Sequence, residues 1–479
     1  MFKNSKKNWG LAVISVLLLS AFVLSACTTP TAAPTEASTA APTEAPTAAP
    51  TEAPTEAAPT YSGILNVRGF SQGDEIATER VKYTLEQLKD VSVVMTEGSL
   101  DKQQFLTSVA SGKVPDLIYI SRSDIGTYAG AGALEPLDEA CIAKQNIDMT
   151  QYYEASVKQN TLAGKIYGLP EFYNIITVLV GDESLAEAGL TPADLDLSNW
   201  DKIAEVNTKL AKFDAQNKVT KIGFDPKLPE FLPLWVAANG GSMLSEDGKT
   251  ATLTDPKVAE ALTFAVSLIE ANGGFDDFMA FRNTWDFWGG GNEFVAKQVG
   301  AFPMEQWYVN VLNGSSPDLK LTILPFLTRE GKPISFETGN TWAIPAGSKN
   351  VDAACAFARL MTSPEAWKVA ATARADARAA AGKTFTGVYS GNKLADEIIF
   401  GQLVKPSGSE SWDAAVKVLV EAQASAISIP ASPASSEFQQ AWQDAVNRVL
   451  AGQQTVEEAL AQAQTEAQTA LDKAWASIK

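Results

Sequence analysis

The sequence of 479 residues contains no histidine. Catalytic triads and dyads with an imidazole base are therefore excluded, as are the common zinc sites with imidazole ligands. The sequence also lacks a phosphate-binding loop of the form GxxxxGK[ST]. We expect no cofactor, no metal site and no catalytic residue. Among enzymes, only those that use carboxylate chemistry stay open.

Cysteine is scarce, with three residues in the whole chain. Cys27 follows the N-terminal apolar run, whereas Cys141 and Cys355 lie far apart in the rest. A disulfide between these two stays open, because exported proteins meet an oxidising environment. Neither their spacing nor a cysteine-rich pattern favours pairing, so we expect two separate buried thiols.

Basic residues are outnumbered by acidic residues, 38 to 56, which gives a net charge of -18. Loss of an N-terminal leader that carries Lys3, Lys6 and Lys7 would move this charge from -18 to about -21. Nucleic-acid binding needs clustered Lys and Arg to neutralise phosphates. The composition therefore predicts a chain with no nucleic-acid partner.

An apolar run at residues 11–24 follows those three lysines. It is shorter than the ~20 apolar residues of a membrane span, and its order of charged, apolar and small residues is typical of a signal peptide. The letters LSAC at 24–27 resemble a bacterial lipobox, in which Cys27 becomes the lipidated first residue. We expect a signal peptide at 1–26 and a lipid anchor on the outer face of the cytoplasmic membrane.

Residues 27–60 consist almost entirely of Thr, Ala, Pro and Glu, with APTEAPT recurring. Such a segment has little apolar surface to bury and cannot offset the entropy cost of folding. Its prolines favour extended conformations. We therefore expect a disordered tether between the anchor and the folded part.

The remaining residues, 61–479, are too many for one compact core and suit two lobes. Their first part alternates predicted strands with predicted helices. This order is typical of a parallel sheet with crossover helices, in which ligands bind at the carboxyl ends of the strands. The predicted strands are 63–70, 91–96 and 116–120, and the predicted helices between them are 74–89 and 101–110.

A second α/β set follows, and the chain after residue 352 is mostly helical in pattern. The last segment, 436–479, has apolar residues at helical spacing with a break at Gly452. We expect strands at 177–180, 319–324 and 341–344, and helices at 200–213, 229–239 and 256–272.

Five stretches in order resemble the extracellular solute-binding protein family of ABC importers, which includes the maltose and maltodextrin receptors. They are VPDLIYI with GALEPLD at 114–138, GKIYGLP at 164–170, FVAKQVGAFPMEQW at 294–307, TWAIPAGSKN at 341–350, and the helical tail at 441–464. Each phrase alone is weak, but their order and spread over residues 61–479 make the resemblance specific.

The resemblance implies an α/β, two-lobed periplasmic-binding-protein-like fold, each lobe a sheet flanked by helices. The hinge would be crossed several times, near 172–175, 325–327 and 382–387. The first lobe would comprise 61–173 with 327–380, and the second 174–326 with 381–479. The resemblance also implies a monomer that is not an enzyme and whose partners are a small solute and ABC permease subunits.

Sugars present hydroxyl groups at their edges and C–H groups on their faces, so receptors use planar polar side chains and aromatic rings. Several tryptophans lie in loops with polar or glycine neighbours, unlike Trp367, Trp412, Trp442 and Trp475, which lie in helical patterns and are assigned to packing. The candidate ligand-binding tryptophans are Trp235, Trp285, Trp288, Trp307 and Trp342.

The remaining candidates come from loops that, by the resemblance, face the cleft between the lobes. The loops after the first and third predicted strands offer Phe70 with small polar or acidic neighbours, where the family often has Trp and acidic groups. This departure puts the identity of the solute in doubt. The candidates are Phe70, Ser71, Asp74, Ser121, Asp124, Glu171, Asn174, Glu305 and Asn340, and Asp74 also suits a helix start.

We therefore expect a lipoprotein that captures an extracytoplasmic sugar or oligosaccharide and delivers it to a permease. The same fold with a polyamine or another small solute is an alternative. A secreted glycoside hydrolase is another, and it would need two opposed carboxylates ~5 to 9.5 Å apart. A purely structural surface lipoprotein fits the two-lobe pattern and the loop tryptophans less well.

Overall fold

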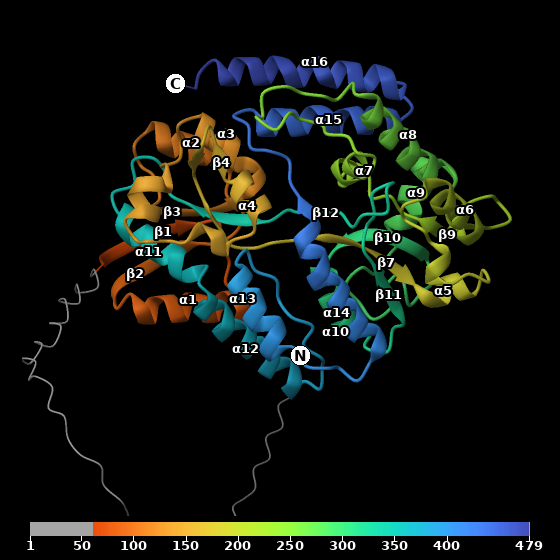
Figure 1. The fold of residues 1–479 in the computed structure, drawn as a ribbon, viewed down its shortest axis with the longest axis horizontal. Helices are drawn as coiled ribbons and strands as arrows, with labels where there is room; N and C mark the ends of the chain where they lie inside the picture. Colours follow the sequence, from red (N-terminus) through yellow and green to blue (C-terminus); the bar gives the residue numbers. More distant parts are fainter. Residues whose placement is uncertain (1–60, 479) are drawn as a thin grey trace, which may run out of the picture. The chain divides into compact units, whose positions relative to one another are not determined.

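The computed structural model describes residues 61–478, so the predicted signal peptide, Cys27 and the tether lie outside the described residues. The described part contains two five-stranded sheets, each flanked by helices, which define two lobes (Figure 1). The first sheet has the order β2-β1-β3-β13-β6 and the second β11-β7-β10-β9-β8. The predicted α/β, two-lobed fold is confirmed.

The first lobe begins with the predicted alternation of strands and helices. Strand β1 pairs in parallel with β2 and β3, and β13 adds antiparallel to β3 and to β6. Helix α1 starts where the Asp74 carboxylate accepts a hydrogen bond from the Ala77 amide (2.9 Å). The strands are β1 (Ser62–Arg68), β2 (Asp90–Thr96), β3 (Leu117–Ser121), β6 (Leu169–Pro170) and β13 (Asn340–Ala343), with a hairpin of β4 (Thr161–Leu162) and β5 (Lys165–Ile166).

Helices cover the first sheet because its strands bury Leu65, Val67 and Val91 on one face and Ile118 and Ile120 on the other. The α-helices are α1 (Glu75–Gln87), α2 (Lys102–Ala110), α3 (Ile125–Gly130), α4 (Glu154–Gln159), α11 (Val351–Met361), α12 (Pro364–Ala380) and α13 (Lys393–Ile398). The short 3-10 and π segments are η1 (Arg122–Asp124), η2 (Asp138–Ala143), η3 (Met149–Gln151) and η5 (Ile399–Leu403).

In the second sheet, β7 and β10 are antiparallel and almost completely buried, since helices pack on both faces. Strand β9, which the sequence analysis missed, pairs in parallel with β10. The strands are β7 (Ile176–Gly181), β8 (Lys212–Phe213), β9 (Val219–Phe224), β10 (Val299–Glu305) and β11 (Leu321–Leu324). The helices between β7 and β11 in the sequence are α5 (Asp182–Ala186), η4 (Pro192–Asp194), α6 (Trp200–Leu210), α7 (Leu232–Ala238), α8 (Pro256–Glu270), α9 (Phe275–Arg282) and α10 (Trp307–Ser315).

The chain crosses between the lobes three times. Residues 171–175 lead from β6 to β7, and residues 325–339 lead from β11 back to β13. These crossing segments bridge each other at Asn174 and Thr338. The third crossing follows Leu403, later than the predicted 382–387, because Ala395 and Ile399 pack against Trp367 of the first lobe.

Cys141 of η2 and Cys355 of α11 form a disulfide, so the expectation of two separate thiols is wrong. The two residues are 214 positions apart in the sequence, and η2 packs directly on α11. Spacing therefore carried no signal, since the fold alone brings these two segments together.

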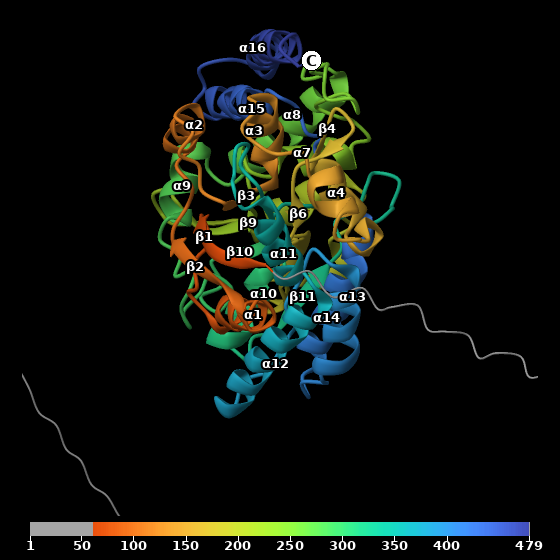
Figure 2. The ribbon, with the colours of Figure 1, turned by 90° about the vertical axis from the view of Figure 1, so that its left-hand side faces the viewer.

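The last helices are α14 (Glu410–Ala422), η6 (Gln423–Ser425), α15 (Ser435–Leu450) and α16 (Val456–Trp475), with β14 (Ala426–Ile427) pairing with β12 (Ser335–Phe336). Helices α15 and α16 form a pair at the top of Figures 1 and 2, and Gly452 lies in the turn between them with a positive φ of 66°. A capping box of Thr455 and Glu458 starts α16. Among the helices of residues 61–478, none has the length and hydropathy of a membrane span.

Candidate ligand-binding site

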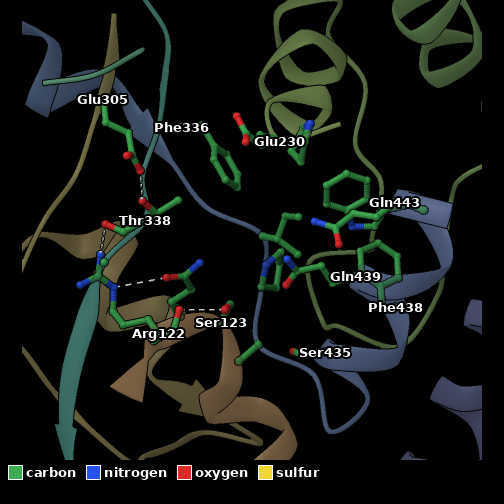
Figure 3. Close-up of a pocket in the computed structure, with 18 residues that line it drawn as sticks. Arg122, Ser123, Glu230, Glu305, Phe336, Thr338, Ser435, Phe438, Gln439 and Gln443 are labelled. Carbon is green, nitrogen blue, oxygen red and sulfur yellow. Dashed lines mark hydrogen bonds between the residues drawn. The ribbon is translucent and has the colours of Figure 1, made fainter. Parts of the chain in front are cut away.

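A cavity of about 330 Å³ lies where the two lobes and their crossing segments meet (Figure 3). The first lobe contributes Ser121 and Ser123, at the carboxyl end of β3, as expected for an α/β sheet. The crossing segment contributes Phe336 and Thr338. The second lobe completes the wall with Glu230, Glu305 and the α15 residues Phe438, Gln439 and Gln443.

Arg122 forms the floor of this cavity (Figure 3). Its buried guanidinium forms an ion pair with Glu337 and donates to Gln159 (3.2 Å), to the carbonyls of Phe172 and Thr338 (2.7 Å for Thr338) in the two crossing segments, and to the Asn340 carbonyl of β13 (3.0 Å). Burial raises the pKa of the Glu337 carboxyl, and the adjacent Arg122 counteracts this shift. All donors of Arg122 are engaged within the protein, so its charge is not available to a ligand.

Glu305, at the end of β10, connects the second lobe to the crossing segment. Its carboxylate accepts hydrogen bonds from the Thr338 hydroxyl (3.1 Å) and the Trp307 indole Nε1 (2.6 Å). Glu305 is half-buried and lines the cavity. The same carboxylate therefore forms part of the wall and fixes the orientation of a neighbouring indole.

That indole belongs to a stacked pair. The rings of Trp288 and Trp307 lie 5.6 Å apart between centroids, with planes 15° apart. Trp307 is half-buried, whereas Trp288 is 66% exposed. Two of the predicted tryptophans are thus brought together beside the cavity wall, with a face of Trp288 in solvent.

Helix α15 presents two amide side chains to the cavity. Gln439 and Gln443 are one helical turn apart, and Figure 3 shows both among the lining residues. The same helix buries Phe438 and Trp442 in the core of the second lobe. Sequence reasoning missed both glutamines, although a polar i, i+4 pair beside an apolar stripe was the available signal.

A second hollow of about 280 Å³ adjoins the cavity at Ser121. It includes the predicted residues Asp124 and Asn340, together with Gly69 and Tyr128. Burial raises the pKa of the Asp124 carboxyl, and Lys102 and a hydrogen bond from Ser436 oppose this shift. The first-lobe wall therefore carries a carboxylate and an amide in addition to its serines.

Trp235, Trp342 and Glu171 are all 0% exposed and line neither hollow. Trp235 donates its Nε1 proton to the Pro226 carbonyl (2.9 Å) inside the second-lobe core. Glu171 accepts hydrogen bonds from Arg80 and Tyr119. Trp235 belongs to α7 and Trp342 to β13, so neither lies in the loop that its sequence neighbours indicated.

Phe70 also lines neither hollow: it is 4% exposed and packs on Tyr119 and Trp342 with centroid distances of 5.1 and 5.0 Å. Asp74 caps α1 and forms an ion pair with Arg374 (2.7 Å), which accounts for it structurally.

Three further candidates lie outside the residues that line the two hollows. Ser71 is exposed and accepts a hydrogen bond from the Gly98 amide (3.0 Å). Asn174 donates its backbone amide to the Thr338 carbonyl (2.8 Å) in the crossing segments. Trp285 stacks on Phe302 at 5.9 Å. Of the tryptophans assigned to packing, Trp367, Trp412 and Trp442 are buried, and Trp475 is half-buried.

The described residues contain no group of three or more Cys, Asp or Glu side chains placed to hold a metal ion. The cavity offers hydroxyls, amides, carboxylates and aromatic rings. Such a set forms hydrogen bonds with a polar solute and contacts its apolar faces.

Comparison with known proteins agrees with this geometry. The sequence profile described as bacterial extracellular solute-binding protein matches residues 82–386. The maltotriose-binding protein of Pyrococcus abyssi (strain GE5 / Orsay) is 23% identical over 291 residues, which are 58% of this chain and 58% of the length of that relative.

Solved structures share the fold. The chain titled CpMnBP1 with mannobiose bound has a TM-score of 0.66 and 22% identity, covering 84% of this chain and 99% of that chain. Maltose-bound T. maritima MalE3 has a TM-score of 0.62 and 18% identity, covering 85% and 99%. Identities this low show the fold alone, whereas the profile spans well over half of the chain. The chain therefore belongs to the bacterial extracellular solute-binding protein family.

Proposed function

We propose that this protein is the solute-binding lipoprotein of an ABC importer and that it captures a neutral sugar or oligosaccharide. One observation carries the proposal. Glu305 lines a cavity that also presents amide side chains, and the same carboxylate accepts a hydrogen bond from one indole of a stacked pair. Planar polar groups suit the hydroxyl edge of a sugar, and indole rings suit its C–H faces. The relatives named for maltotriose, mannobiose and maltose support this choice.

Capture occurs by closure of the two lobes, 61–173 with 327–403 and 174–326 with 404–479. A solute in the cavity contacts Ser121 and Ser123 on one lobe and Glu305 and Gln443 on the other. Because both sets of contacts form together only when the lobes are closed, the solute favours the closed state by its differential affinity. The permease subunits then recognise the closed form, and the protein catalyses no reaction.

Attachment to the membrane follows from the lipobox at Cys27, with the segment 28–60 as the tether. Acyl chains contribute ~0.8 kcal/mol per buried methylene, so two or more chains hold a protein durably. The folded part acts as a monomer outside the cytoplasmic membrane. Cys27→Ser should release the protein from the membrane fraction while leaving solute binding unchanged.

A cationic solute such as a polyamine is the second candidate. Glu230 and Glu305 line the cavity, and Arg122, the basic residue of its lining, is fully engaged with Glu337 and backbone carbonyls. A cation would therefore meet carboxylates without a competing positive charge. The aromatic pair favours the sugar, since a flexible aliphatic amine makes little use of a flat indole face.

The test is calorimetric titration of the purified protein with maltose- and mannose-series oligosaccharides and with spermidine. We expect saturable binding of a neutral saccharide without turnover, and Trp307→Ala should weaken it roughly 30-fold, or about 2 kcal/mol. The control is Phe213→Ala, which removes a 39% exposed ring from β8 in the second lobe.

Binding of spermidine alone would overturn the sugar assignment. Release of shorter saccharides during incubation would instead establish a glycoside hydrolase. If Trp307→Ala leaves the affinity unchanged, the indole pair is not part of the binding site.

A further inference from the structure

Trp288 is the most exposed large hydrophobic side chain in the described part of the chain, at 66%, ahead of Ile64 at 57% and Val94 at 55%. It lies in the glycine-rich segment 284–291, between α9 and β10. One face of its indole stacks on Trp307, and its ring makes a T-shaped contact with Phe287 at 5.3 Å. Since the stack with Trp307 covers one face and the side chain is still 66% exposed, the opposite face is open to solvent.

The contacts behind Trp288 hold that open face in place. Phe287 stacks on Tyr308 with a centroid distance of 4.1 Å and planes 13° apart. The Tyr308 hydroxyl lies 2.9 Å from the Phe287 carbonyl and 2.7 Å from the buried Glu293 carboxylate. The Lys227 ammonium lies 4.8 Å from the Phe302 centroid and 5.6 Å from that of Phe287. The segment is thus anchored by the second-lobe core although Trp288 itself faces solvent.

The open face is connected to the cavity through two contacts. Trp307 stacks on Trp288 and donates its Nε1 proton to Glu305 (2.6 Å), and Glu305 lines the cavity. A cavity of about 330 Å³ is at the small end of ligand sites, which span ~300–1,000 Å³. A saccharide that outgrows this volume has to continue along the wall, and the indole pair is the apolar surface adjoining Glu305.

We propose that the exposed face of Trp288 is an outer subsite that stacks against one further pyranose ring of a neutral oligosaccharide whose first rings occupy the cavity. This inference rests on the proposed sugar-binding function. It gives the protein a preference for longer chains, because only they reach Trp288. The inner contacts at Glu305 and Gln443 are the same for short and long chains.

The test measures Kd by calorimetry for maltose- and mannose-series saccharides of increasing length with the wild type, Trp288→Ala and Trp288→Phe. For the shortest saccharide that binds, Trp288→Ala should change Kd by less than about twofold. For the longest, it should weaken binding roughly 2- to 10-fold, the range of one aromatic stacking contact, and Trp288→Phe should retain most of the affinity. Val295→Ala, which removes another exposed side chain (44%), is the control.

Near-ultraviolet circular dichroism reports the Trp288–Trp307 pair directly and shows whether Val295→Ala leaves it intact. Equal losses for all chain lengths would overturn the outer subsite and place Trp288 in the inner site. No loss at any length would overturn it as well. If the wild type binds no saccharide, the sugar-binding function itself fails and this inference fails with it, whereas binding with a length-independent effect overturns the inference alone.

Discussion

The two lobes are held together in different ways. Buried apolar side chains of the second lobe form one continuous cluster that extends from β7 to α16. Buried apolar side chains of the first lobe, including those of helices α11 to α13, divide into three smaller clusters. The first lobe instead contains the Cys141–Cys355 disulfide and the buried ion pairs Arg80–Glu171 and Arg122–Glu337.

These polar links have a common location. Glu171 and Glu337 belong to the crossing segments, whereas Arg80 and Arg122 belong to the first lobe. A continuous apolar core stabilises a lobe without fixing its orientation, but a buried ion pair stabilises one particular geometry. The comparison indicates that buried ion pairs attach the first lobe to the crossing segments, whereas the second lobe is attached to them by hydrogen bonds, such as those of Glu305 and Gln306.

The largest expected effect is that of Arg122→Ala. Both side chains of the Arg122–Glu337 pair are 0% exposed, so removal of the arginine leaves a buried carboxylate without a partner. Such a loss lowers the free energy of unfolding by about 3–5 kcal/mol. Urea unfolding followed by circular dichroism measures it.

The matched control for that experiment is Arg329→Ala, because Arg329 is 46% exposed and pairs with an equally exposed Glu260. Removal of this surface pair should cost ~0–1 kcal/mol. Equal costs for the two arginine variants would break the comparison between the lobes, since the buried pair would then stabilise no more than a surface one.

Removal of the disulfide should have the next largest effect. In Cys141→Ala/Cys355→Ala, the unfolded chain loses a cross-link that joins residues 214 positions apart. We expect the free energy of unfolding to fall by about 2–4 kcal/mol. Added reductant should destabilise the wild type and leave the double variant unchanged, so a reductant-sensitive double variant would refute the assignment.

A further expected effect is a pH dependence at Asp396, which lies between the lobes. Its carboxylate accepts hydrogen bonds from the Ser390 amide and hydroxyl (2.9 and 2.7 Å), from Tyr153 of the first lobe (2.9 Å) and from Gln423 of the second (2.7 Å). Burial raises the pKa of Asp396 from 3.8 to about 7, and these donors oppose the shift.

Between these pKa values the folded protein retains the Asp396 proton while the unfolded chain loses it. The free energy of unfolding should therefore fall by up to about 1.4 kcal/mol per pH unit as the pH rises through this window, and Asp396→Asn should abolish that fall. Urea midpoints at about pH 5 and about pH 8 check it, and parallel pH profiles for wild type and variant would contradict the assignment.

Local patterns predicted much of the fold. Strands β1, β2 and β3 and helices α1 and α2 follow from alternation, apolar periodicity and the capping residues Asp74 and Asp101. The order of these elements predicted a sheet whose strand ends carry polar loops. Strand β9 was missed because Thr220 and Lys221 interrupt its apolar residues in the sequence, although Lys221 is buried in the structure.

The candidate site was predicted only in part. Ser121 and Glu305 line the cavity at the ends of β3 and β10, and Trp307 and Trp288 lie beside Glu305. Trp235 and Trp342 have equally polar neighbours in the sequence, yet they belong to α7 and β13, and their side chains are buried in the cores of the second and first lobes. Those cores are built from segments far apart in the chain, and no local pattern contains that information.

Helix α15 gives the chain a defined order of assembly. Its Phe438 and Trp442 complete the second-lobe core, and its Gln439 and Gln443 complete a cavity whose opposite wall is formed more than 300 positions earlier, at Ser121. Because a chain is synthesised from its N-terminus, the cavity wall is incomplete until residue 443 has been added.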